Sequence, residues 1–194
     1  MIIDFAEKIY HWLNTHDRHM SILLNDSIPE NQIDELCSSL PIKLPKELKK
    51  IYQWHNGTVN EKGYTYEMLS FFPGFFLISL QEAIDNYHSF IKDDRWNKMW
   101  FPVFANGGGD FFVIECSEHR MLDESCILGF IIDYEEVEIE YLSLTKMFET
   151  IYLCYKEGAY YIDEDNCLEI NVKKEAVIAN KRNPNLDRWL GELQ

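Results

Sequence analysis

Residues 101–115 read FPVFANGGGDFFVIE, two runs of bulky apolar residues on either side of three glycines. Successive residues such as Phe111 and Phe112 point to opposite faces of a strand, so a strand of this kind is covered on both faces. The glycines allow the positive φ angles of a tight connection between neighbouring strands. The stretch therefore predicts two adjacent strands inside a covered sheet, and the rest of the chain must supply the cover.

A glycine-rich loop can instead cradle a phosphate, but that site needs a helix directly after the loop. Here the loop leads into a strand, and the negative charge of Asp110 would repel a phosphate. We interpret the loop as a turn and expect Asp110 to bond to its N–H groups. The residues expected to act only as structural turns are Asn56, Gly57, Gly107, Gly108 and Gly109.

Apolar residues at helical spacing predict amphipathic helices over about 2–57. The first helix follows the N-terminus. Ser27 and Glu30 have the spacing of a capping box for a second helix. A third begins at Pro45 and is expected to end at Asn56, with Gly57 as its left-handed cap.

Aromatic and β-branched runs broken by turn residues predict a strand meander over about 64–142, starting with YTYEMLSFF. One helix interrupts it, because Ser79 and Glu82 form a second capping-box pattern. Helices over about 143–190 close the chain, the first of them ending at Gly158. We expect one domain over 1–194 of the α+β class, with a mostly antiparallel, twisted sheet of about six strands and helices before and after it packing on one face.

The formal net charge is -15 and the isoelectric point is about 4.7. Nucleic acids and anionic membranes require a basic face, so we expect neither as a direct partner. Residues 110–150 contain eleven acids against two basic residues, Arg120 and Lys146. A basic protein partner that approaches this segment fits the charge best.

The most acidic stretch is DYEEVEIE, residues 133–140, in which the glutamates alternate with apolar residues at strand spacing. One interpretation is an exposed edge strand whose charges prevent pairing with other sheets. The other is a recognition surface for a basic partner, extended by the turn before the strand. Its candidate residues are Asp133, Tyr134, Glu135, Glu136, Glu138 and Glu140.

Catalytic and metal-binding patterns fail when their full requirements are applied. His16 and His19 lack a third ligand at zinc spacing, and the DEDN stretch at 163–166 lacks the glycine and glutamate of a calcium loop. On the face of Glu136, Glu138 and Glu140 no apolar residue alternates that would shield one carboxylate for acid catalysis. We expect no enzyme activity, no catalytic residues, no cofactor and no metal.

The five cysteines form no C-x-x-C pair, and several lie among apolar residues as reduced thiols do. The N-terminal stretch has no basic region of an export signal, and no apolar run reaches the length of a membrane span. We expect a cytoplasmic protein.

Several motifs, in their order, resemble those of the SUKH superfamily: LPKELKKIYQWHNG, LISLQEAI, WFPVFANGGGDFFVIE, GFIIDYEEVE, LSLTKMFETIYLCY and NPNLDRW. The similarity runs from about residue 33 to 189. Two differences are the three glycines before Asp110, where members commonly have one or two, and a first helix without a counterpart.

The resemblance implies a protein-binding domain without catalytic residues. Its bacterial members resemble immunity proteins that neutralise toxin domains, often nucleases, of polymorphic toxin systems. With the acidic charge, it predicts an immunity protein for a basic nuclease toxin. The alternative is an intracellular regulatory or scaffolding module like the fungal cell-wall assembly regulators. Trp54 and Asp110 are candidates for a secondary contact with the partner.

Overall fold

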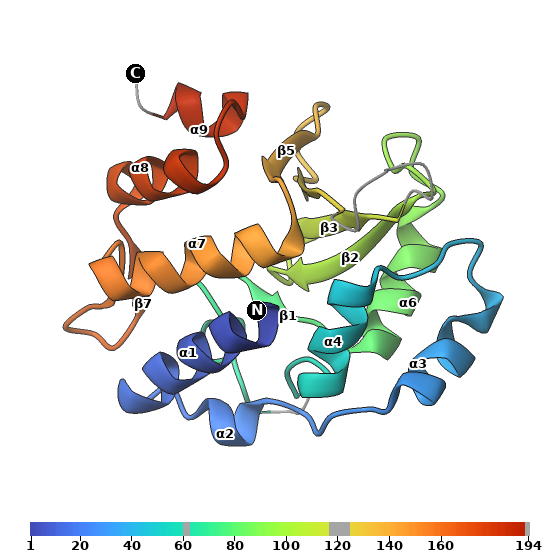
Figure 1. The fold of residues 1–194 in the computed structure, drawn as a ribbon, viewed down its shortest axis with the longest axis horizontal. Helices are drawn as coiled ribbons and strands as arrows, with labels where there is room; N and C mark the ends of the chain where they lie inside the picture. The colour runs from blue at the N-terminus through green and yellow to red at the C-terminus, as the bar shows by residue number, and fades with distance from the viewer. Residues whose placement is uncertain (60–62, 117–124, 193–194) are drawn as a thin grey trace.

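The computed structural model describes residues 1–59, 63–116 and 125–192. Five antiparallel strands form a meander in which each strand pairs with the next along the chain, and helices flank the sheet (Figure 1). This confirms the expected α+β class and antiparallel arrangement. The strands of the meander are β1 (Phe76–Leu77), β2 (Trp100–Ala105), β3 (Phe111–Glu115), β4 (Ile127–Phe130) and β5 (Glu138–Tyr141).

The central strand is β3, and it is covered on both faces. Phe111 lies 4.8 Å, between ring centroids, from Phe90 at the end of α6 (Leu80–Phe90). On the other face Phe112 pairs with Phe104 of β2, whose ring lies 5.9 Å from that of Phe148 in α7 (Leu144–Glu157). The expectation of helices on one face is therefore refined, because α6 covers one face and α7 the other.

The helices before the sheet include the expected amphipathic first helix, whose apolar side is buried. It packs beside α7, the helix that follows the five-stranded sheet in the chain (Figure 1). These helices are α1 (Ile2–Thr15), α2 (Met20–Leu23), α3 (Glu30–Leu36), the 3-10 helix η1 (Cys37–Ser39), α4 (Lys46–Trp54) and α5 (Tyr66–Leu69).

Later in the chain, α6 lies between β1 and β2, and four further elements follow α7. Within the described ranges, no helix combines the length and apolar character needed to cross a membrane. These elements are α6 (Leu80–Phe90), α7 (Leu144–Glu157), β6 (Tyr160–Ile162), β7 (Leu168–Ile170), α8 (Val172–Arg182) and α9 (Asp187–Gly191).

Two of the expected helix signals are present. Ser79 and Glu82 form the reciprocal capping box at the start of α6. Gly158 ends α7 with φ 71°. The expected box at Ser27 is wrong, because α3 begins after Pro29 and has no side-chain cap.

Two further assignments differ from the sequence-based expectation. The first part of the meander contains the short helix α5, which Thr65 caps by accepting a hydrogen bond from the Met68 N–H. After α7, β6 and β7 form a separate hairpin where closing helices were expected. The turn of this hairpin is held by Asp163 Oδ1, which accepts hydrogen bonds from Asp165 N and Cys167 N, so in both places a local side-chain contact outweighs the apolar pattern.

The segment after α4 packs directly against the segment that enters α6, a contact that the helix pattern does not predict. The helix ends at Trp54, and Gly57, with φ 71°, does not cap it. Asn56 Oδ1 accepts a hydrogen bond from Leu80 N at the start of α6. A Cβ atom on Gly57 would lie 2.3 Å from Ser79 N and 2.6 Å from Ile78 O. Glycine is required here because another backbone passes directly against it.

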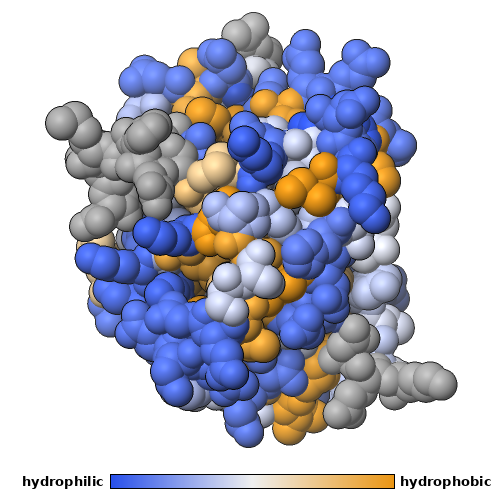
Figure 2. Space-filling model, turned by 90° about the vertical axis from the view of Figure 1, so that its right-hand side faces the viewer, coloured by the Kyte–Doolittle hydropathy of each residue, from blue (hydrophilic) through white to orange (hydrophobic). Residues whose placement is uncertain are grey.

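Figure 2 shows the side of the molecule that carries α3 and α6. Hydrophilic side chains cover most of it, and a band of apolar surface shows between them.

Gly57→Ala should destabilise the protein by on the order of 3 kcal/mol or more, because the clash is with backbone and adds to the strain of a positive φ. Gly74→Ala is the matched control, since Gly74 has φ 79° but open space around the added Cβ. It should cost only about 1 kcal/mol. Urea unfolding measures both. Equal losses would contradict the role of close approach at Gly57.

Candidate functional site

An acidic groove with a volume of about 680 Å³ lies along β5 at the edge of the sheet. Five of the six acidic-stretch candidates line it, and the sixth, Asp133, is exposed beside it. The lining also includes two residues near the C-terminus. The acidic groove is lined by Gly129, Ile131, Tyr134, Glu135, Glu136, Glu138, Glu140, Arg188 and Glu192.

The loop before β5 is held from both sides. Arg95 Nη1 donates hydrogen bonds to Ile132 O at 2.7 Å and Tyr134 O at 3.0 Å. Asp110 Oδ1 accepts a hydrogen bond from Ile132 N at 2.9 Å. Hydrogen bonds from Arg95 in turn lower the pKa of Asp93 to about 2. The exposed acidic side chains of the loop are thus presented from a fixed backbone.

The glutamates of β5 do not share one environment. Glu136 and Glu138 are exposed, whereas the Glu140 side chain is only 12% exposed. Arg188 of α9 covers it, with its Nε 3.3 Å from Glu140 Oε2. Gly129 on β4 leaves room for the carboxylate, since a Cβ there would lie 2.7 Å from Glu140 Oε1. The even, exposed ladder expected from the sequence therefore stops at Glu138.

Burial raises the pKa of Glu140 to about 7, opposed by the Arg188 guanidinium and assisted by Glu175 and Glu138. Burial also raises the pKa of Glu175, which accepts a hydrogen bond from the Tyr160 hydroxyl. Two shielded carboxylates thus lie near Arg188. Because α9 produces this shielding, the raised pKa of Glu140 has a structural origin.

The C-terminal helices also bond to the backbone of the edge strand. Trp189 Nε1 donates to Glu140 O at 2.6 Å, and Leu142 N donates to Asn183 Oδ1 at 3.1 Å. Both backbone groups are therefore occupied by side chains rather than by another strand. The groove is better suited to receive side chains of a partner than an added strand.

The glycine loop is organised by a residue that sequence reasoning missed. Asn106 Oδ1 accepts hydrogen bonds from Gly108 N at 2.7 Å and Asp110 N at 3.1 Å. Asn106 Nδ2 donates to Asp110 Oδ2 at 2.6 Å. Asn106 therefore bonds the loop N–H groups, the role expected of Asp110, and Asp110 connects the loop to Ile132. An asparagine before glycines is the local signal that indicates this role.

The other secondary candidate, Trp54, lies apart from the lining of the groove. Its Nε1 donates to Glu7 Oε1 at 2.7 Å, and its ring meets that of Tyr10 edge-on. Trp54 thus connects α4 to α1. Arg95 and Arg188 were also missed as site residues, because their partners lie far away in the chain.

Within residues 1–59, 63–116 and 125–192, no three histidine, cysteine, aspartate or glutamate side chains are grouped so that they could hold a metal ion.

Residues 27–151 match the SMI1 / KNR4 family (SUKH-1). The chain belongs to this family. The match includes β5 and most of the acidic groove but ends within α7, so Arg188 and Glu192 lie beyond it. No curated protein sequence matches the chain.

Glu140→Gln should change how stability depends on pH. The folded pKa of about 7 exceeds the usual value of 4.5, so the folded chain keeps a proton that the unfolded chain releases. The stabilisation is complete below about pH 4.5 and is lost as the pH rises through about 7.

Between pH 5 and 8 the free energy of unfolding of the wild type should therefore fall relative to Glu140→Gln, by on the order of 1–3 kcal/mol. Urea unfolding at several pH values measures this, with Glu138→Gln, at an exposed position, as the control. Glu175 is present in all three proteins, so its own titration contributes to each of them. Parallel curves for the wild type and Glu140→Gln would contradict the shielding of Glu140.

Proposed function

We propose that this chain is a cytoplasmic immunity protein that binds and neutralises a basic toxin domain, a nuclease being the expected class. The observation that carries the proposal is the acidic groove in a SUKH-1 domain, a family that includes toxin-immunity proteins. Nucleases bind polyanions, so their active-site surfaces are basic. An acidic binder both attracts such a surface and competes with the nucleic acid for it.

The groove has the features of a recognition surface as well as its charge. Glu135, Glu136 and Glu138 are exposed around it, and Tyr134 is 66% exposed. Tyrosine is enriched among the residues that dominate binding energy at interfaces. Since Arg95 and Asp110 hold this loop, little ordering would be needed on binding, which favours affinity.

Arg188 and Glu140 have a different part in the proposed interface. Arg188 covers Glu140 at the inner end of the groove, so the exposed acidic groups of the lining are concentrated at Glu135, Glu136 and Glu138. The proposed binding surface therefore consists of the exposed residues of the set predicted from the sequence, and Glu140 supports them from a shielded position. Catalysis has no part in the proposal.

Growth rescue tests the function directly. In polymorphic toxin systems the immunity gene follows the toxin gene, so the toxin domain encoded directly upstream should arrest a bacterial host. Co-expression of this chain should restore growth. Arrest that persists with soluble chain present, or an upstream gene without toxicity, would contradict immunity and favour the regulatory or scaffolding module.

With the purified toxin domain, Glu136→Gln/Glu138→Gln should slow association by on the order of tenfold at low salt and much less at high salt, because long-range attraction is screened. The control Glu157→Gln/Glu164→Gln removes the same charge at exposed positions outside the groove. Stopped-flow or surface plasmon resonance gives the rates. If both double variants slow association equally, the net charge, not the groove, guides the encounter.

A further inference from the structure

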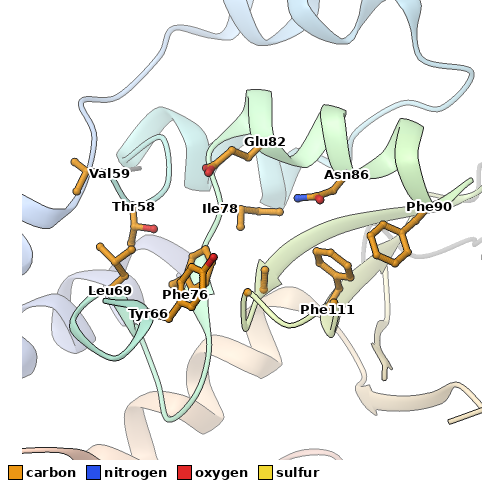
Figure 3. A pocket seen from close by; sticks show the side chains of 13 residues that line it. Thr58, Val59, Tyr66, Leu69, Phe76, Ile78, Glu82, Asn86, Phe90 and Phe111 are labelled. Carbon is orange, nitrogen blue, oxygen red and sulfur yellow. The ribbon is translucent and has the colours of Figure 1, made fainter. Parts of the chain in front are cut away.

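A second cavity, of about 270 Å³, lies between α6 and the glycine loop (Figure 3). We name it the α6 pocket. Ligand sites for cofactors and small molecules usually span about 300–1,000 Å³, so this pocket suits a single side chain better than a cofactor. Its lining is Thr58, Val59, Tyr66, Leu69, Phe76, Ile78, Glu82, Asn86, Phe90, Ala105, Gly107, Gly109 and Phe111.

Aromatic rings form much of the wall. Tyr66 stacks on Phe76 with centroids 5.3 Å apart and planes 2° from parallel. Phe90 meets Phe111 edge-on at 4.8 Å. Phe76 and Phe111 are buried, whereas Tyr66 is 57% exposed at the mouth. Such a wall accepts the methylene groups of a long side chain or the face of a planar cation.

Polar groups converge on the same space from α6. Glu82 and Asn86 are one helical turn apart, and both side chains reach toward the pocket (Figure 3). Glu82 Oε2 accepts hydrogen bonds from Ser79 N at 3.0 Å and Ser79 Oγ at 2.7 Å, which fixes the carboxylate. Among the described residues of the lining, Glu82 is the one with a charged side chain. The polar end of the pocket therefore favours a cation.

The glycine loop connects the pocket to the acidic groove. A Cβ on Gly107 would lie 2.3 Å from the Tyr66 ring, so the loop packs directly on the pocket wall. On its other side, a Cβ on Gly109 would lie 2.8 Å from Ile132 Cδ1, in the loop that presents Tyr134 to the groove. A single partner surface could therefore engage both sites.

We propose that the α6 pocket binds one arginine side chain of the protein partner. The guanidinium would lie near Glu82 and Asn86, and its stem would pack on the aromatic wall. Arginine fits better than lysine because its planar group stacks on rings and offers several donors in one plane. The inference rests on the proposed function for the identity of the partner, although the pocket chemistry can be tested without it.

The two sites would act on different rates. Exposed charges along the groove govern the encounter, whereas a side chain held in a pocket governs how long the complex lasts. The α6 pocket is thus assigned the anchoring part of recognition.

Titration with N-acetyl-arginine amide, followed by nuclear magnetic resonance, tests the pocket alone. We expect saturable shifts of the Gly107 and Gly109 amide resonances, which N-acetyl-leucine amide should not reproduce. Asn86→Phe fills the pocket and should weaken the apparent affinity by about tenfold or more. Asn86→Leu, of similar size to asparagine, removes the amide and should weaken it too, while Gln81→Phe, at an exposed position of α6, should not.

Absence of shifts, equal shifts with the leucine compound, or unchanged affinity in both Asn86 variants would overturn the pocket proposal. With the toxin domain, Asn86→Phe should raise the dissociation rate about tenfold and leave association unchanged. An unchanged dissociation rate in a chain that still neutralises toxin would reject the pocket and leave the immunity function standing. Failure of growth rescue would reject the function, and the titration would still decide the pocket.

Discussion

The close backbone contact at Gly57 is the constraint on which the arrangement of this domain depends. It lets the chain after α4 pass directly against the segment that enters α6, where Asn56 supplies the first hydrogen bond of the helix. Asn25 N donates a hydrogen bond to Gly57 O at 2.9 Å, and His55 Nδ1 lies 2.8 Å from Asn25 O. His55 and Asn56, through their side chains, and Gly57, through its backbone, thus join the segment after Leu24 and the start of α6 to the end of α4.

Once α6 and α7 are placed on the two faces of the sheet, the loops at the edge take positions that define both proposed binding sites. The glycine loop lies between them, with Tyr66 against Gly107 and Ile132 against Gly109. Asp110 and Arg95 hold the loop before β5. The recognition surface thus rests on strands and packed loops, an arrangement that favours binding without large ordering costs.

Sequence patterns were sufficient where the signal was local and failed where a contact across the fold decided. The capping box at Ser79 was predicted because its two partners are three residues apart. The strand expected around Tyr66 is the short helix α5, which Thr65 caps and whose Tyr66 ring packs on Gly107 from a distant part of the chain. Gly57 was expected to end a helix, but a glycine is needed at this position because the backbone of Ile78 and Ser79 approaches it closely.

The sequence by itself determined the central strands, the main amphipathic helices and the acidic character of the stretch before β5, because periodicity, turn residues and charge are local properties. The tertiary structure decided which carboxylates are exposed and which are shielded. Glu138 and Glu140 look alike in the sequence, but α9 covers only the second, and Trp189 reaches its carbonyl from 49 residues away. Burial sets the pKa of a carboxyl group and its availability to a partner. The residues that flank Glu140 in the sequence do not indicate that a distant helix buries it.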